Sequence, residues 1–203
     1  MRRVSITYLV LAGIICVLIV IKSADYLSPD FTKGFLLGKS GIFKYYKFFL
    51  YAHILGAPIA LLTGIFQFTR ISKNWHKNIG KVYVVSVLLF AAPGGFGMAL
   101  FALGGVFSIV NFVLLSCLWF YTTLNAYQKA SKGAIPAHKV WITRSFILAN
   151  SAVIIRLLSF ANNHYYWMNQ TEGYILISWL SWVPGLLIFE LVQWSKRRKV
   201  VIF

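Results

Sequence analysis

Four histidines and one arginine are the residues of this chain whose types and positions could do chemistry inside an apolar environment. They are His53, His76, His138, His164 and Arg156. Helical bundles hold b-type haem through imidazoles on facing helices, so histidines at two depths favour such a cofactor. The set predicts a histidine-lined site inside a bundle, with haem b as a candidate occupant.

Two of the histidines occur in similar local sequences, each followed by lysine. Pro136 suits a first helical turn, so we expect His138 inside a helix, with His76 opening another helix at the same depth. Together with Arg144 and Glu190 they would form an inner cluster that binds a cofactor. Two alternatives stay open: the histidines bind lipid phosphate, or Glu190 simply pairs with Arg144.

An outer cluster is predicted from helical geometry. Arg156 follows His138 by 18 residues, about five turns, so both lie on one helix face. An arginine inside hydrocarbon is expensive and should face the bundle interior with a partner. His53 lies at a similar depth, and His164 lies at or beyond the outer end of the helix that carries Arg156. The alternative is that Arg156 only clasps a backbone carbonyl or a lipid headgroup.

A strip of small residues lies beside His53. Small side chains recur every fourth residue, at Ala52, Gly56, Ala60 and Gly64. Such a ridge lets another helix or a flat ligand approach closely. Gln67 lies four turns beyond His53, at the other end of this face. The strip therefore indicates either tight helix packing, with His53 bonded to a neighbouring carbonyl, or a cofactor that lies on the glycines.

The composition requires that these residues be positioned by membrane helices. Of the 203 residues, 59% are hydrophobic and 12% charged, whereas soluble domains are about 45–50% apolar and about 25% charged. This excludes a soluble globular domain, a disordered chain and a fibrous repeat. One span needs about 20 apolar residues. We predict an all-α integral membrane protein, a bundle of six transmembrane helices at residues 5–21, 47–69, 82–103, 107–127, 141–160 and 174–194.

The net charge of +16 indicates orientation. Fourteen of the 20 lysines and arginines lie on alternate connections, five lie on the opposite side, and Arg156 lies within a span. By the positive-inside rule both termini are cytoplasmic, in a bacterial inner membrane. Basic residues divided among four short loops do not favour nucleic-acid binding, so the lipid bilayer is the expected partner. Residues 93–97, rich in proline and glycine, predict a kink or a break in the helix of the third span.

Three parts of the chain follow from these spans. Residues 1–46 hold an uncleaved anchor helix and an outer loop, residues 47–160 a four-helix core, and residues 161–203 an outer loop, the sixth helix and a basic tail. The two cysteines lie in apolar runs without a Cys-x-x-Cys pattern, so no metal site of that type is expected.

The motifs of the core match a known pattern. They are His53-Ile54-x-Gly56, Leu62-x-Gly64-x-x-Gln67-Phe68, His76-Lys77-x-x-Gly80-Lys81-x-Tyr83, His138-Lys139-x-Trp141-x-x-Arg144-Ser145 and a later Arg156. Over about residues 50–160 the chain resembles the bacterial predicted-membrane-protein family called domain of unknown function 2306. Usual members have arginine after both histidines and methionine after the tryptophan, where this chain has Lys77, Lys139 and Ile142. The resemblance implies a polytopic inner-membrane protein and no established activity.

A looser likeness, at the level of the fold, is to b561-type transmembrane cytochromes, which arrange histidines at two membrane depths. It implies inner haem ligands His76 and His138 and outer ligands His53 and His164, with arginine near the propionates. We expect haem-linked or quinone-linked electron transfer with a redox partner. A small transporter or channel, and a non-catalytic assembly or sensor protein, are the alternatives. Catalytic residues and oligomeric state are not indicated.

Overall fold

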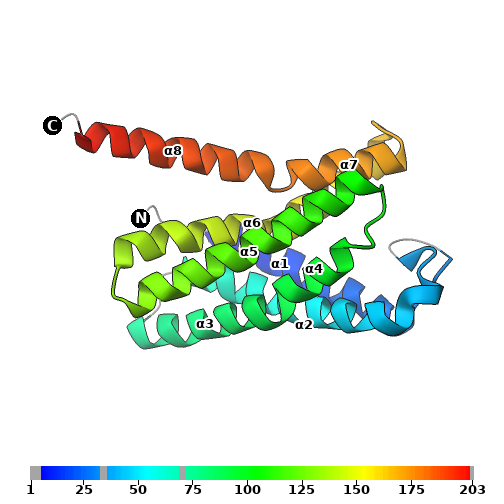
Figure 1. The fold of residues 1–203 in the computed structure, drawn as a ribbon, viewed down its shortest axis with the longest axis horizontal. Coiled ribbons are helices and arrows are strands. Elements are labelled where there is room, and N and C mark those ends of the chain that lie inside the picture. The colour runs from blue at the N-terminus through cyan, green and yellow to red at the C-terminus, as the bar shows by residue number, and fades with distance from the viewer. Residues whose placement is uncertain (1–5, 33–35, 69–71, 202–203) are drawn as a thin grey trace.

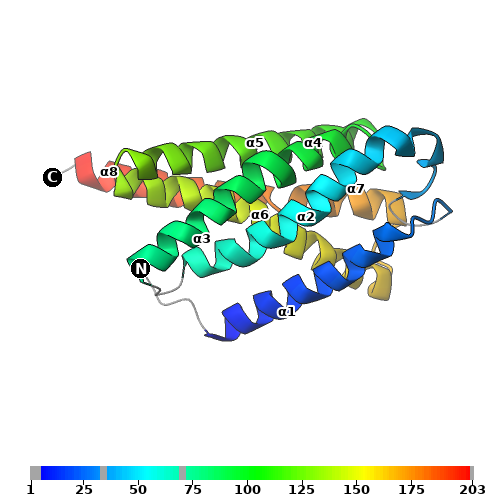
Figure 2. The ribbon, with the colours of Figure 1, turned by 90° about the horizontal axis from the view of Figure 1, so that it is seen from below.

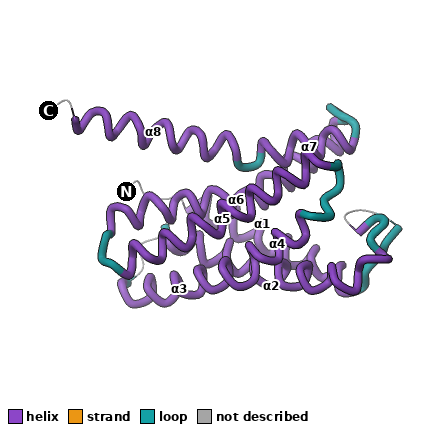
Figure 3. Tube along the Cα trace, viewed as in Figure 1, coloured by secondary structure: helices purple, strands orange, loops and turns teal. Residues whose placement is uncertain are grey.

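The computed structural model describes residues 6–32, 36–68 and 72–201, and these residues form helices and connections without a strand (Figure 3). The first residue of the predicted span 5–21 and the last residue of the predicted span 47–69 lie outside the described residues. In chain order the helices are α1 (Ile6–Ser23), η1 (Ala24–Leu27), η3 (Ser40–Ile42), α2 (Phe43–Gln67), α3 (Lys73–Val85), η4 (Ser86–Ala91), α4 (Ala92–Ala99), α5 (Val106–Ser131), α6 (Ile135–Tyr165), α7 (Gln170–Leu180) and α8 (Val183–Val201).

Five helical stretches within the described residues are long and apolar enough to cross a membrane, judged by length and composition. They are Ser40–Gln67, Lys73–Ala99, Val106–Ser131, Ile135–Tyr165 and Gln170–Arg198. A sixth apolar segment, Gly13–Ser23 in α1, is shorter. The chain is therefore an all-helical, multi-span membrane bundle, as the composition predicts.

The bundle is built from antiparallel neighbours that follow one another along the chain (Figure 1). Helices α2 to α6 form its centre, and α1 packs along α2 on one side, as Figure 2 shows. Helix α8 diverges from α5 and α6 toward the C-terminus. We call the end that holds η1 and the connection between α6 and α7 the outer end, following the charge distribution, and the opposite end the inner end.

The third span is one continuous helix that begins earlier than its apolar run. Ser72 caps the first turn of α3, and its Oγ accepts a hydrogen bond from the backbone N–H of Trp75 at 3.4 Å. The kink predicted for this span is a π-helical segment, η4, which ends just before Pro93 in the first turn of α4. Proline has no N–H to donate to the preceding turn, and a wider turn accommodates this.

The sixth predicted span is not one helix. It divides into α7 and α8 at Ser181 and Trp182, with Pro184 in the first turn of α8. Proline restricts the residue before it and cannot complete the bond of a continuing helix, so the break precedes it. The Oγ of Ser181 donates to the carbonyl of Ser178 at 2.7 Å, and this bond occupies one of the carbonyls at the end of α7.

The small strip of α2 is covered by neighbouring helices. A methyl group added at Gly56 would lie 2.6 Å from the Cβ of Phe90 and 2.7 Å from the backbone nitrogen of Ala91. One added at Gly64 would lie 2.8 Å from the ring of Phe146. The strip is therefore a packing surface for η4, α3 and α6, and the idea that a cofactor lies on these glycines is wrong.

The segment between α1 and α2 forms a small second core at the outer end. Leu36, Tyr46 and Leu50 are buried there, and the partly buried Tyr26 packs against them. The buried Lys39 places its ammonium group 5.7 Å from the centre of the Tyr46 ring, and burial lowers the pKa of Lys39. Tyr26 and Leu50 of this core also line the cavity of the candidate site.

Candidate ligand-binding site

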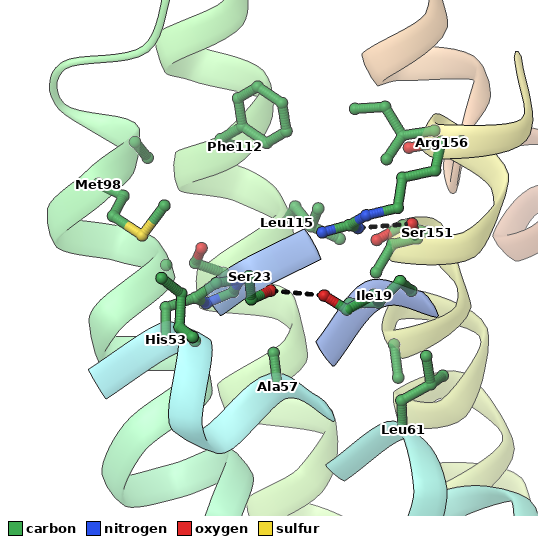
Figure 4. Close-up of a pocket in the computed structure, with 18 of the residues that line it drawn as sticks. Ile19, Ser23, His53, Ala57, Leu61, Met98, Phe112, Leu115, Ser151 and Arg156 are labelled. Atoms are coloured by element: carbon green, nitrogen blue, oxygen red, sulfur yellow. Dashed lines mark hydrogen bonds between the residues drawn. The ribbon is translucent and has the colours of Figure 1, made fainter. Parts of the chain in front are cut away.

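A cavity of about 570 Å³ lies in the outer half of the bundle. Its walls come from α1, η1, α2, α4, α5, α6 and α7, and most of them are apolar (Figure 4). Drug-sized ligands occupy pockets of roughly 300–1,000 Å³ that are largely apolar with a few placed polar groups. The polar groups here include His53, Arg156, Tyr26, Tyr174 and Asn163. The cavity has the size and composition of a small-molecule site.

His53 enters the cavity from α2 with one ring nitrogen already engaged. Its Nδ1 lies 2.7 Å from the carbonyl oxygen of Ala91. A carbonyl oxygen only accepts, so Nδ1 carries the hydrogen and Nε2 of the neutral ring is an acceptor. Close approach of α4 makes this contact, since a methyl group at Gly95 would lie 3.2 Å from Nδ1. The predicted bond between His53 and a neighbouring carbonyl is confirmed.

Arg156 enters the same cavity from α6. Its Nη1 donates to the carbonyl of Ala152, one turn earlier, at 2.8 Å, and Figure 4 shows the side chain extended toward Leu115. This confirms the alternative that Arg156 bonds to a backbone carbonyl. The bond uses one of the five N–H donors of the guanidinium group. Within the described residues no carboxylate pairs with Arg156, whose electrostatic neighbours are Tyr26, Cys16 and His53. The side chain of Arg156 is exposed and lines the cavity, so a ligand in the cavity can contact it.

The outer cluster does not include His164. This residue is exposed at the C-terminal end of α6, outside the lining of the cavity. Its ring stacks on Phe160, with centroids 6.3 Å apart, and meets the edge of Tyr165. The expected pairing of His53 with His164 is therefore absent from the described structure, because the last turn of α6 directs His164 away from the bundle interior.

Below His53 and Arg156, the cavity is bounded by Trp119 of α5, which belongs to a hydrogen-bonded ring. Its indole Nε1 donates to the hydroxyl of Tyr83 at 3.3 Å, and that hydroxyl lies 2.5 Å from Oγ of Ser145. Ser145 in turn lies 2.7 Å from Oγ1 of Thr123, which donates to the backbone carbonyl of Trp119 at 2.7 Å. The ring joins α3, α5 and α6.

The direction of each hydroxyl in this ring can be assigned. The hydroxyl of Thr123 has one hydrogen, which it donates to the Trp119 carbonyl, so its oxygen accepts a hydrogen bond from Ser145. The Ser145 hydroxyl is then an acceptor toward Tyr83, and Tyr83 accepts from the indole of Trp119. Every proton has an acceptor, so the ring fixes the position of Trp119 at the cavity wall.

The inner histidines lie apart from the cavity. Nδ1 of His138 is 2.9 Å from the carbonyl of Ala126 on α5, which leaves Nε2 without a partner among the described residues. His76 is half-buried in α3 and interacts electrostatically with His138. Nε2 of Gln67 donates to the backbone carbonyl of His76 at 3.4 Å. The two inner histidines are thus electrostatic neighbours, and Gln67 joins α2 to α3.

Arg144 and Glu190 pair with each other at the inner end. Nε and Nη2 of the arginine donate to the two carboxylate oxygens, at 2.6 and 2.9 Å. The guanidinium carbon also lies 4.4 Å from the centre of the Trp141 ring. The pair links α6 to α8, so both charges are occupied and neither joins the histidines in a common cofactor site in this structure.

Sequence reasoning missed Trp119 and its hydrogen-bonded ring, and it missed Tyr26 in the cavity wall. Tyr83, Thr123 and Ser145 are hydroxyl residues within apolar runs, and that was the signal available, since polar groups in a membrane must be satisfied by other groups. Tyr26 gave no signal, because it lies in a connection whose path over the bundle depends on tertiary packing.

Comparison with known proteins identifies a family. A family model described as a predicted membrane protein of the domain of unknown function 2306 matches residues 50–193. The chain belongs to this family, DUF2306. No curated protein and no solved structure matches it. The matched region of this DUF2306 protein holds His53, Arg156, the hydrogen-bonded ring and the Arg144–Glu190 pair, whereas the α1 and η1 walls of the cavity precede it.

Proposed function

We propose that this protein binds a lipid-soluble, amphiphilic small molecule in the outer cavity, with the apolar body against the walls and a polar head on Arg156. The observation that carries the proposal is a guanidinium that opens into an apolar cavity without a carboxylate partner among the described residues. A charged side chain at the centre of a bilayer costs about 2.5–3.5 kcal/mol on insertion scales, so a partner of opposite or accepting character is expected.

Quinones belong to this ligand class. A quinone has two carbonyl oxygens that would accept hydrogen bonds from Arg156, and its isoprenoid tail would suit the apolar wall. The reduced form would present a hydroxyl that can donate to Nε2 of His53. This supports the quinone-linked function expected from the sequence, with electron transfer to a redox partner as its purpose.

Binding is tested with the protein in lipid nanodiscs, using the fluorescence of Trp119 at the cavity wall and mass spectrometry of extracted lipid-soluble molecules. We expect a molecule to copurify in near-stoichiometric amount, and a short-chain quinone to quench tryptophan fluorescence saturably. Arg156→Gln should weaken binding at least about tenfold, the loss of one charge-assisted bond. Arg197→Gln, on the exposed end of α8, is the matched control and should bind as wild type.

The proposal fails if no lipid-soluble molecule copurifies and neither a quinone nor a single-chain lipid binds saturably. It also fails if Arg156→Gln and Arg197→Gln bind with the same affinity. The Trp119→Phe variant tests whether the quenched fluorescence comes from the cavity. It should lose the quenching and still copurify with the lipid-soluble molecule.

Haem b stays a second candidate, favoured by the inner pair. His138 donates from Nδ1 to the Ala126 carbonyl, the arrangement by which metal-binding imidazoles are usually oriented, and His76 is its electrostatic neighbour. Haem would supply one-electron chemistry there. A reduced-minus-oxidised spectrum with an α-band that is lost in His138→Ala, and kept in His164→Ala, would support it. No α-band and no extractable haem after haem-supplemented expression would exclude it.

A bacterial inner membrane, with both termini in the cytoplasm, is the location that we propose from the basic residues of the alternate connections. In that orientation the cavity lies in the leaflet farther from the cytoplasm. A ligand would then exchange with that leaflet between the helices that border the cavity.

A further inference from the structure

The polar groups of the outer cavity restrict the chemistry of its ligand further than an apolar wall does. This inference rests on the proposed binding function and adds to it. The relevant groups are the free acceptor of His53 and the free donors of Arg156, which enter from different helices (Figure 4). His53 can therefore bind a hydrogen-bond donor of the ligand, and Arg156 can bind an anion or a hydrogen-bond acceptor.

The acceptor is Nε2 of His53. Because Nδ1 donates to the Ala91 carbonyl at 2.7 Å, the tautomer is fixed while that contact holds. This bond is also compatible with a protonated ring, since an imidazolium donates from Nδ1 to the same carbonyl. Among the described residues, Nε2 has no partner of its own. A proton brought by a ligand can therefore be taken up without breaking an existing bond.

The charge around this acceptor is positive. Arg156 on α6 interacts electrostatically with His53, and the other titratable side chains at the cavity are Tyr26 on η1 and Tyr174 on α7. Cys16 on α1 adds a thiol near Arg156. Among the described residues the cavity lining contains no carboxylate, and α2, α4 and α5 add no further charge to it. Asp25 on η1 is outside the lining and interacts electrostatically with Tyr26. Protonation of His53 would place two cations around one apolar cavity, which Coulomb repulsion disfavours.

An anion bound at Arg156 removes this obstacle. It neutralises one of the two positive charges, so anion binding and protonation of His53 favour each other, and each raises the affinity for the other by the same factor. We propose that the ligand is a lipophilic weak acid, taken up from the bilayer as the neutral acid and held as its anion on Arg156 with the proton on Nε2 of His53.

The transfer balances in atoms and charge. The O–H bond of the neutral acid breaks, the N–H bond at Nε2 of His53 forms, and the electron pair stays on the acid oxygen that faces Arg156. The filled site has the same net charge as the empty site. Entry as a neutral molecule also avoids moving a charge through hydrocarbon. A single-chain carboxylic acid and an acidic phenol both satisfy this chemistry.

The test uses the whole protein in nanodiscs of zwitterionic lipid, so that anionic headgroups do not compete. A fluorescent polyene fatty acid is displaced by hexadecanoic acid, by its methyl ester and by hexadecane-1-sulfonate. The sulfonate stays anionic at every working pH, so any pH dependence of its binding comes from the protein. We expect the acid and the sulfonate to bind at least about tenfold more tightly than the ester, through charge-assisted bonds to Arg156.

The pH dependence identifies the proton site. Binding of the sulfonate would take up one proton at His53, so its affinity should be lower at about pH 8 than at about pH 6, by up to about tenfold per pH unit. His53→Gln should bind the sulfonate with a flat pH profile, because no ring remains to titrate. His164→Gln, an exposed histidine outside the cavity, should keep the wild-type slope.

Arg156→Gln should reduce the acid and the sulfonate to the affinity of the ester. The inference is overturned if the sulfonate binds equally at both pH values, if His53→Gln keeps the wild-type slope, or if ester and acid bind alike. In the last case the cavity still binds an amphiphile and the proposed function stands. If the polyene acid, the ester, the sulfonate and a quinone all fail to bind wild type, the proposed function itself is wrong.

Discussion

Arg144 and Arg156 lie on the same helix, α6, and differ in the hydrogen bonds that their guanidinium groups make. Arg144 and Glu190 meet through two charge-assisted bonds, so their side chains are fixed and link α6 to α8. Arg156 makes one bond to its own helix and keeps its remaining donors for the cavity. Two arginines of one helix thus differ in role, because only one of them meets a carboxylate.

Tyr83→Phe should destabilise the protein by about 1–3 kcal/mol, because it leaves the Trp119 N–H without an acceptor in a buried ring and removes the bond that the Ser145 hydroxyl accepts. Unfolding monitored in detergent micelles measures the change. Tyr121→Phe is the control, since Tyr121 is exposed on α5 and its hydroxyl is outside the ring. Equal losses in the two variants would mean that the ring contributes nothing.

At this scale the sequence predicted residue types better than partners. Arg156 and His53 were expected to share an outer site, and they border one cavity. His164 was expected there too, but each residue of an α-helix turns the side-chain direction by about 100°, and in the last turn of α6 His164 is exposed and points away from the cavity. The pairing of Arg144 with Glu190 was open as an alternative, because it depends on how α8 packs beside α6.

At the scale of the elements, close helix contact holds the cavity's walls. Gly56 of α2 meets the backbone of η4, and Gly94 of α4 meets the backbone of α2, so each helix has a glycine where the other approaches. Small residues at such positions let membrane helices pack through backbone atoms, where van der Waals contact is the main attraction. The same approach brings the Ala91 carbonyl to His53.

Gly56→Ala should cost about 1–3 kcal/mol or more, since its methyl group would lie 2.6 Å from the Cβ of Phe90, and backbone must move to relieve the contact. Gly13→Ala, also in a helix, meets nothing within 4 Å and should be neutral or slightly stabilising. Thermal unfolding of both variants in the same detergent is the measurement. If Gly56→Ala proves as stable as wild type, α2 does not approach η4 as closely as described.

The helices themselves were largely predictable, since long apolar runs with polar connections have few alternatives in a membrane. The π-helical segment was indicated only as a kink near Pro93, because the type of distortion depends on how neighbouring helices satisfy the freed backbone groups. The division of the sixth span at Trp182 was missed, since the residues on both sides of the break are mostly apolar and Pro184 was the main local signal.

For the whole molecule, the charge distribution and the cavity position define two unlike ends. Basic residues concentrate at the inner end, where the turn between α5 and α6 and the end of α8 lie. The cavity lies in the other half and borders the core formed by Leu36, Tyr46 and Leu50, since Leu50 belongs to both. In the orientation that we propose, a ligand from the outer leaflet would not need to pass the basic inner surface.

Reporter fusions should give opposite results at the two ends. Alkaline phosphatase placed after Tyr166, between α6 and α7, should be active, and the same enzyme placed after Lys132, between α5 and α6, should be inactive. Green fluorescent protein in the second position should fluoresce. The reason is the excess of lysine and arginine in the alternate connections. Reversed activities would invert the assigned orientation while leaving the bundle unchanged.

The π-helical segment has a consequence for relatives of this chain. A π-helical turn holds one more residue than the α-helical turn that it replaces, so η4 is equivalent to a one-residue insertion within Ser86–Ala91. Removing that residue would rotate α4 by about 100° relative to α3. A family member shorter by one residue here would turn Gly94 and Gly95 away from His53, and its histidine would lose both its carbonyl and its close neighbour.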